Sequence, residues 1–240
     1  MAGERYPASI LSQQLLVGVA EELKLPLLQI ARQLELAQLN GNANANLATV
    51  QATAQTALQL LDNYVLGVRL ALEPQHFPLE AVSVSSVLYD ASQQLDAFAK
   101  SYGVSLELNI AGKYGPVLAN KQGLQAALVS VGAALIEALP ALEGTQQLKL
   151  HLATHRSRYG IIAGVYADTK KLSNEALQRG RRLQGRSRQP LLNLSQSNGA
   201  GIFVADAILH AMDLRLMASR HHRLHGLGTV MQSNYQLQLV

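Results

Sequence analysis

The chain has 240 residues, of which 48% are hydrophobic and 15% are charged; this composition is typical of a folded globular protein and excludes a disordered one. It contains no cysteine, which excludes disulfides, thiolate catalysis and cysteine metal sites. The net charge of +4 is small, so by itself it indicates no class of partner.

The first residues lack the charged region and the apolar run of a signal peptide. The longest nearly apolar runs, such as residues 126–136, fall short of the roughly 18 residues that span a bilayer. We therefore expect a cytoplasmic protein without membrane insertion. Because no sensor segment precedes Ala8, we expect any input signal to come from another protein or a diffusible ligand.

Two helices are predicted in the N-terminal third. From about Ala8 to Leu39, apolar residues recur at steps of three and four, the period of a helix. The segment Asn40–Asn46 is rich in residues that adopt turn conformations. A second apolar series follows it, consisting of Leu47, Val50, Ala54, Ala57, Leu61, Tyr64, Val68 and Ala71. This seam pattern predicts an antiparallel helical hairpin.

Both helices carry further apolar residues outside the seam, namely Leu15, Leu28, Leu36, Leu58, Leu60 and Leu66. Because a hairpin buries only one stripe of each helix, these residues predict a homodimer in which two hairpins form a four-helix bundle. Pro74 and Pro78 end the second helix. We therefore predict a dimerisation hairpin at residues 1–75 and a second domain at 76–240.

The second domain alternates between helical and strand patterns. In chain order we predict a helix at 84–102, strands at 104–110 and 116–119, a helix at 121–139, strands at 147–154 and 159–167, a helix at 201–212 and two terminal strands. This order favours an α/β sandwich, with one mixed sheet covered by helices. The whole chain is thus predicted to be of the α+β class.

Three segments resemble motifs of bacterial sensor histidine kinases. "EELKLPL" (Glu21–Leu27) resembles the phosphoacceptor motif H-E-L-R-T-P-L, whose proline bends the helix. "ADTKKL" (Ala167–Leu172) is similar to the D-x-G-x-G box, and "NGAGIFVADAILHAMDLRL" (Asn198–Leu216) to the segment G-L-G-L-x-I-V. The resemblance implies dimerisation and histidine-phosphotransfer helices followed by a GHKL-type ATPase domain, over nearly the whole chain from Ala8.

The chain departs from this family at the positions that carry its chemistry. The phosphoacceptor histidine falls on Glu21, and the first 75 residues contain no histidine, so a phosphoimidazole cannot form there. Ser130 and Ala134 occupy the places of the two asparagines that the family uses near Mg²⁺. Lys170 and Leu172 replace the glycines of the D-x-G-x-G box. We therefore predict no bound cofactor.

Some residues of the family's nucleotide site remain as vestigial candidates. The resemblance implies that Asp168 accepts from the adenine amino group, although such a residue is more often in a solvated turn. Gly199 and Gly201 precede a helix and could cradle a phosphate, or could serve tight packing. His221, His222 and His225 favour a solvated hairpin turn over a zinc site.

We predict a pseudo-histidine kinase: a non-catalytic dimeric scaffold or adaptor that binds a protein such as a response regulator receiver domain. The predicted partner-binding face consists of Glu21, Glu22, Lys24, Leu25 and Gln29. The second candidate is an arginine loop in the place of the family's nucleotide lid, with Arg179, Arg181, Arg182, Arg186 and Arg188.

Two alternatives stay open. One is an atypical ATP-binding kinase in which Glu137 replaces the missing metal ligand. The other is a nucleic-acid-binding protein that acts through the arginine loop. No aromatic residue is interleaved in that loop to stack on bases, which makes nucleic acid the less favoured partner.

Overall fold

The computed structural model describes residues 23, 29–30, 43–72, 76–110, 112, 114–139, 148–168 and 200–233. Leu23, Gln29 and Ile30 are helical, and the rest of the predicted first helix lies outside the described residues. The elements are α2 (Ala43–Leu72), β1 (Glu80–Val82), α3 (Val84–Ser101), β2 (Val104–Ile110), β3 (Val117–Ala119), α4 (Lys121–Ala138), β4 (Leu148–Ser157), β5 (Gly160–Ala167), α6 (Ala200–His210), β6 (Leu216–His221) and β7 (Leu224–Met231).

The main sheet has five strands in the order β2-β4-β5-β7-β6. β2 pairs with β4 in parallel, and the other neighbours pair antiparallel, so the sheet is mixed, as the sequence predicts. β1 and β3 form a separate two-stranded antiparallel sheet. The sequence analysis missed β1, because three residues are too few to show an alternating pattern.

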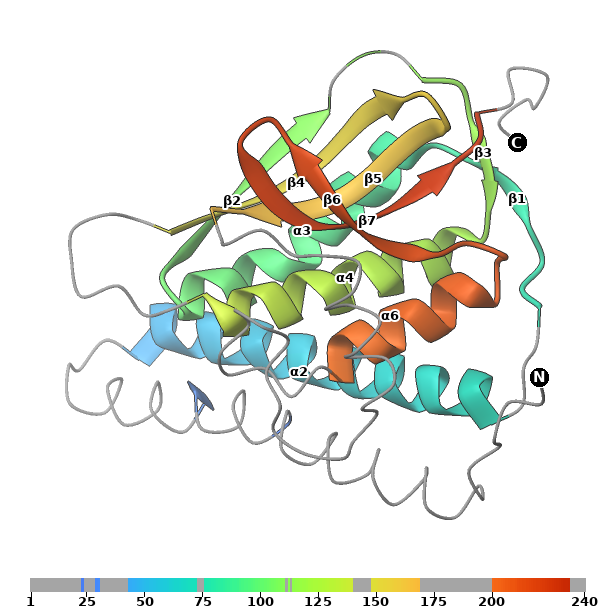
Figure 1. Ribbon diagram of the computed structural model, residues 1–240. Coiled ribbons are helices and arrows are strands. Elements are labelled where there is room, and N and C mark those ends of the chain that lie inside the picture. Colours follow the sequence, from blue (N-terminus) through green and yellow to red (C-terminus); the bar gives the residue numbers. More distant parts are fainter. Residues whose placement is uncertain are drawn as a thin grey trace.

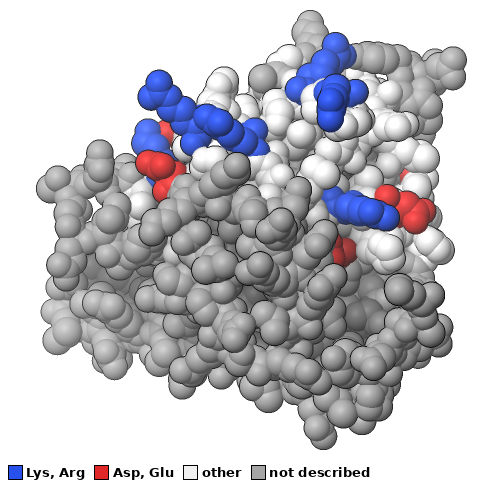
Figure 2. Space-filling model, in the orientation of Figure 1, with Lys and Arg blue, Asp and Glu red and all other residues white. Residues whose placement is uncertain are grey.

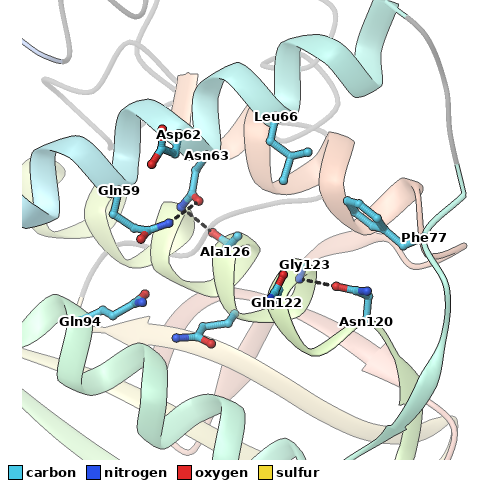
Figure 3. Close-up of a pocket in the computed structure, with 11 residues that line it drawn as sticks. Gln59, Asp62, Asn63, Leu66, Phe77, Gln94, Asn120, Gln122, Gly123 and Ala126 are labelled. Carbon is cyan, nitrogen blue, oxygen red and sulfur yellow. Dashed lines mark hydrogen bonds between the residues drawn. The ribbon is translucent and has the colours of Figure 1, made fainter.

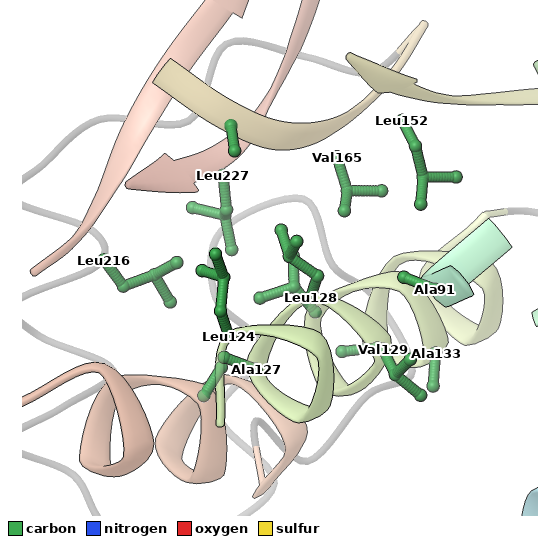
Figure 4. Packing of buried hydrophobic residues seen from close by; sticks show 14 of the residues in the cluster. Ala91, Leu124, Ala127, Leu128, Val129, Ala133, Leu152, Val165, Leu216 and Leu227 are labelled. Atoms are coloured by element: carbon green, nitrogen blue, oxygen red, sulfur yellow. The ribbon is translucent and has the colours of Figure 1, made fainter. Parts of the chain in front are cut away.

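Helices α3, α4 and α6 cover one face of the five-stranded sheet (Figure 1). α4 begins at the cap residue Asn120, whose Oδ1 accepts a hydrogen bond from the Gly123 amide at 2.8 Å. Leu124 and Leu128 of α4 belong to one buried cluster with Val165 and Leu227 of the sheet (Figure 4). Because α4 is buried over most of its length, it is the central helix of the fold.

Helix α2 forms a third layer, on the side of α3, α4 and α6 that faces away from the sheet (Figure 1). Leu60, Tyr64 and Leu70 of α2 belong to the same buried cluster as the core of the sandwich. A Cβ atom on Gly67 would lie only 3.0 Å from Val204 Cγ2, so α2 and α6 pack closely. The predicted domain boundary falls among residues 73–75, outside the described residues, and remains a prediction.

The packing of α2 corrects one detail of the sequence analysis. Leu60 was assigned to the surface that a second copy covers, but only 3% of it is exposed and it packs within the chain's own core. Leu66, assigned to the same surface, is half-buried against this core, whereas Leu58 is 61% exposed. The periodicity of a helix shows which residues share a stripe, but it does not show which neighbour covers that stripe.

Candidate functional site

The face of α4 that carries Ser130 is the place where the family resemblance puts the metal ligands. Ser130 is fully buried, and Asn63 of α2 is 3% exposed. Asn63 Nδ2 donates long hydrogen bonds of 3.4 Å to Ser130 Oγ and to the Ala126 carbonyl oxygen. Helix α2 therefore lies directly on this face of α4.

Helix α6 approaches the same turn of α4 from another side. A Cβ atom on Gly201 would lie 2.8 Å from the Ser130 carbonyl oxygen and 3.2 Å from Ala134 Cβ. Only glycine permits the two helix backbones to come this close. Gly201 therefore has a packing role in this fold, and its predicted phosphate-binding role remains a prediction.

The structure describes only some of the other predicted site residues. Asp168 is the first residue after β5 and is exposed at the end of that strand. Gln29 is helical and half-buried. The remaining candidates lie outside the described residues: Gly199, Glu21, Glu22, Lys24, Leu25, Arg179, Arg181, Arg182, Arg186 and Arg188.

Glu137 lies seven residues after Ser130 on α4, so the two residues share one face of the helix. Its side chain is buried, and burial raises the pKa of the carboxyl from its ordinary value of 4.5 to about 7. Burial, and secondly the charge of Glu137, raise the pKa of Tyr102 at the end of α3. The described part of the chain offers the Glu137 carboxylate no hydrogen bond or ion pair.

The raised pKa of Glu137 gives a prediction on stability. Since the folded-state pKa lies above the unfolded one, the folded state binds more protons between pH 4.5 and 7, and stability falls as the pH rises through this range. Glu137→Gln removes this loss. We expect the variant and the wild type to be equally stable near pH 4.5 and the variant to be more stable at pH 8, by roughly 3 kcal/mol at most.

Urea unfolding of both proteins from pH 4.5 to 8 measures this difference.

Three histidines also make stability depend on pH. Burial lowers the pKa values of His151, His155 and His221, so these residues reduce stability as the pH falls below their ordinary value of 6.5. Both proteins contain these histidines, so their contribution cancels in the comparison. A pH-independent difference between the two proteins would show that Glu137 does not change its protonation in this range.

The histidines near the C-terminus are only partly as predicted. His222 stands in the tight β6–β7 turn with a left-handed φ of 52° and is exposed, as expected. His221 is 6% exposed instead of solvated, because it lies against His155 and Tyr166, with ring centroids 5.3 and 5.5 Å away. Among the residues that the structure describes, no group of three or more His, Asp or Glu side chains could hold a metal ion.

The sequence analysis missed a polar cavity between α2 and the helices α3 and α4 (Figure 3). It has a volume of about 580 Å³, and we call it the amide groove; its polar lining residues are Gln59, Asp62, Asn63, Gln94, Asn120, Gln122 and Gln125. Asn63 is not one of the seam residues of the predicted hairpin, so the periodicity did not indicate that its polar side chain would be buried. The rest of the groove depends on how three helices meet, which periodicity does not reveal.

No protein-family model matches the sequence, and no curated protein matches it. Among solved structures, full-length ShkA in complex with AMPPNP superposes with a TM-score of 0.51 at 13% identity, covering 95% of this chain and 47% of that chain. The chain has the fold of a histidine kinase core. It spans about half the length of the ShkA chain.

Two further solved structures are similar. The histidine kinase AdeS of Acinetobacter baumannii has a TM-score of 0.48 at 13% identity, with 88% of this chain and 96% of that chain covered. The cytoplasmic segment of the histidine kinase QseC has a TM-score of 0.46 at 7% identity, with 77% and 94% covered. Within the described ranges, no helix has the length and apolar character needed to cross a bilayer.

Proposed function

We propose that this protein is a non-catalytic histidine kinase homologue that acts as a dimeric scaffold for a signalling protein. The observation that carries the proposal is the packing of α2 on α4. Asn63 and Ser130 are both buried and lie in hydrogen-bonding contact. A metal-bound nucleotide at Ser130 would first have to displace α2.

The residue types at this place support the same proposal. A serine hydroxyl and the methyl group of Ala134 stand where the family has two carboxamides. Mg²⁺ requires several oxygen ligands at near-octahedral geometry, and one hydroxyl that already accepts a hydrogen bond supplies little of that set. The ShkA structure was determined with AMPPNP, a nucleotide analogue. We infer that this chain keeps the scaffold without nucleotide chemistry.

The two alternatives receive less support. Glu137, the substitute metal ligand of the atypical kinase, is buried and would be partly protonated near neutral pH, whereas a metal ligand must be ionised.

The nucleic-acid alternative would be favoured by a continuous basic surface. Figure 2 shows the described Lys and Arg side chains on the face in view in separate groups and not as one band. Lys149 pairs with Glu107, and Lys121 pairs with Asp90.

The proposed partner is a receiver domain, which would dock on the face that contains Leu25. Leu25 is an apolar residue among the polar residues Glu21, Glu22, Lys24 and Gln29, and an apolar residue in such surroundings can anchor an interface. We expect Leu25→Asp to weaken the capture of receiver domains on the order of tenfold or more, because the aspartate would be desolvated in the interface. Biolayer interferometry with purified receiver domains from the same genome measures the change.

A second variant, Arg182→Asp in the arginine loop, tests the second candidate surface in the same experiment. Light scattering confirms that each variant keeps the mass of the wild type. If Leu25→Asp binds as well as the wild type and Arg182→Asp does not, the docking face is the arginine loop. If the wild type captures no receiver domain, the proposed partner class is wrong.

A further inference from the structure

The lining of the amide groove includes side-chain carboxamides from three helices. Gln59 and Asn63 come from α2, Gln94 from α3, and Gln122 from α4, and Figure 3 shows them around one space. A second cavity of about 550 Å³ shares Gln59, Asp62 and Gln94 with it, so the groove continues along α2. Together the two cavities exceed the space that one small sugar ring or amino acid needs.

Part of this polar lining is free to bind a ligand. Gln59 donates to Asn63 at 3.3 Å, and Asn63 donates to α4, so these two residues are held in place. Within the described part of the chain, the side chains of Gln94, Gln122 and Gln125 make no hydrogen bond, and the Asp62 carboxylate forms no ion pair. The groove therefore offers three carboxamides and one carboxylate to a bound molecule.

The charge of the described lining residues disfavours an anionic ligand. None of its described lining residues is Lys, Arg or His, and Asp62 would repel a phosphate or a carboxylate. A nucleotide is therefore unsuited to this groove. The apolar lining residues are Leu66, Phe77 and Ala126 in the first cavity, and Leu58, Ala97 and Val129 in the cavity that continues it.

Hydroxyl groups match this lining. A carboxamide both donates and accepts, and so does a hydroxyl group, while a carboxylate accepts from two hydroxyls. Phe77, at one end of the groove, packs against Gly123 and presents an aromatic ring on which the C–H face of a sugar can rest (Figure 3). We infer that the amide groove binds a neutral oligosaccharide, whose hydroxyls pair with Gln94, Gln122 and Asp62.

A ligand in this groove would contact both α2 and α4 and would favour the state in which the two helices are packed together. It would thereby stabilise the contact between Asn63 and Ser130, which lies beside the groove. The sugar is then a diffusible input that sets the position of α2. This inference rests on the groove alone and stands whether or not the protein binds a receiver domain.

Saturation-transfer NMR tests the inference directly. The probes are glucose, maltotriose, cellotriose and N,N′,N″-triacetylchitotriose at millimolar concentration, each with the full-length protein. We expect at least one of the three trisaccharides to receive saturation from the wild type. The double variant Gln94→Ala/Gln122→Ala should weaken that binding by roughly tenfold or more, since two hydrogen bonds are lost.

Gln232→Ala is the matched control, because Gln232 is an exposed glutamine outside the groove, and this variant should bind like the wild type. Binding that survives in the double variant would overturn the inference, as would the absence of a signal from all three trisaccharides. An alanine tripeptide amide is the competing probe. If it binds in the groove and the sugars do not, the groove recognises peptide groups and the inference is wrong.

Discussion

Val65→Asp is expected to convert the protein from a dimer to a monomer. Val65 and Leu58 lie seven residues apart on α2, which places them on one face of the helix, and they are 44% and 61% exposed. Both face away from the core that α2 shares with the sandwich. In the proposed four-helix bundle a second copy covers this face.

The effect is large because a two-fold interface contains every substitution twice. A desolvated, unpaired carboxylate costs several kcal/mol, so the dissociation constant of the dimer should rise on the order of a hundredfold or more. Light scattering at micromolar concentration should give the wild type about twice the chain mass of 25.9 kDa and the variant a single chain mass.

Tyr89→Asp is the control for this substitution. Tyr89 is 54% exposed on α3, outside the proposed interface, so this variant should remain a dimer. Far-UV circular dichroism shows whether each variant is folded. A wild type that is monomeric at micromolar concentration would rule out the bundle, and a folded dimeric Val65→Asp would place the interface on another surface.

Gly201→Leu is the second substitution with a large expected effect, and it acts on the contact between α4 and α6. The new Cβ would lie 2.8 Å from the Ser130 carbonyl oxygen, which belongs to a helix backbone and cannot rotate away. The two helices must separate, and overpacking of this kind costs roughly 1 to 3 kcal/mol or more. Urea unfolding should show the loss as a lower midpoint.

Two further variants serve as comparisons for Gly201→Leu. Gly201→Ala adds the Cβ alone and should cause a smaller loss than leucine. His210→Leu places leucine at an exposed position of the same helix and should change stability by less than about 0.5 kcal/mol. If Gly201→Leu is as stable as the wild type, α6 does not pack on α4 at this distance, and the packing role of Gly201 is wrong.

The sequence predicted the sandwich well because its elements have strong local signals. The alternating segment "VSLELNI" is strand β2 with the expected bounds, Val104–Ile110, and the predicted helix at 121–139 is α4 to within one residue. The match to the fold of ShkA confirms the mixed α+β class. Order and period along the chain were sufficient for these elements.

The candidate site was less predictable, because it depends on which faces of the helices and strands pack against one another. From the periodicity of α2 we assigned Leu60 to an outer surface. In the structure its side chain is buried in the core of the sandwich. His221 belongs to a hairpin of polar sequence, yet pairing of β6 in the sheet brings it against His155 of β4. The contact of Asn63 with Ser130 joins residues 67 positions apart, and no local pattern indicates it.

Isothermal titration calorimetry with ATP and Mg²⁺ tests the central claim most directly. The proposed scaffold has α2 on the face of α4 that carries Ser130, with Asn63 in contact, and lacks the carboxamides of the family. We predict no heat above dilution when millimolar ATP with Mg²⁺ is titrated into the full-length protein. Saturable binding with micromolar affinity would contradict the account and would favour the atypical kinase that uses Glu137.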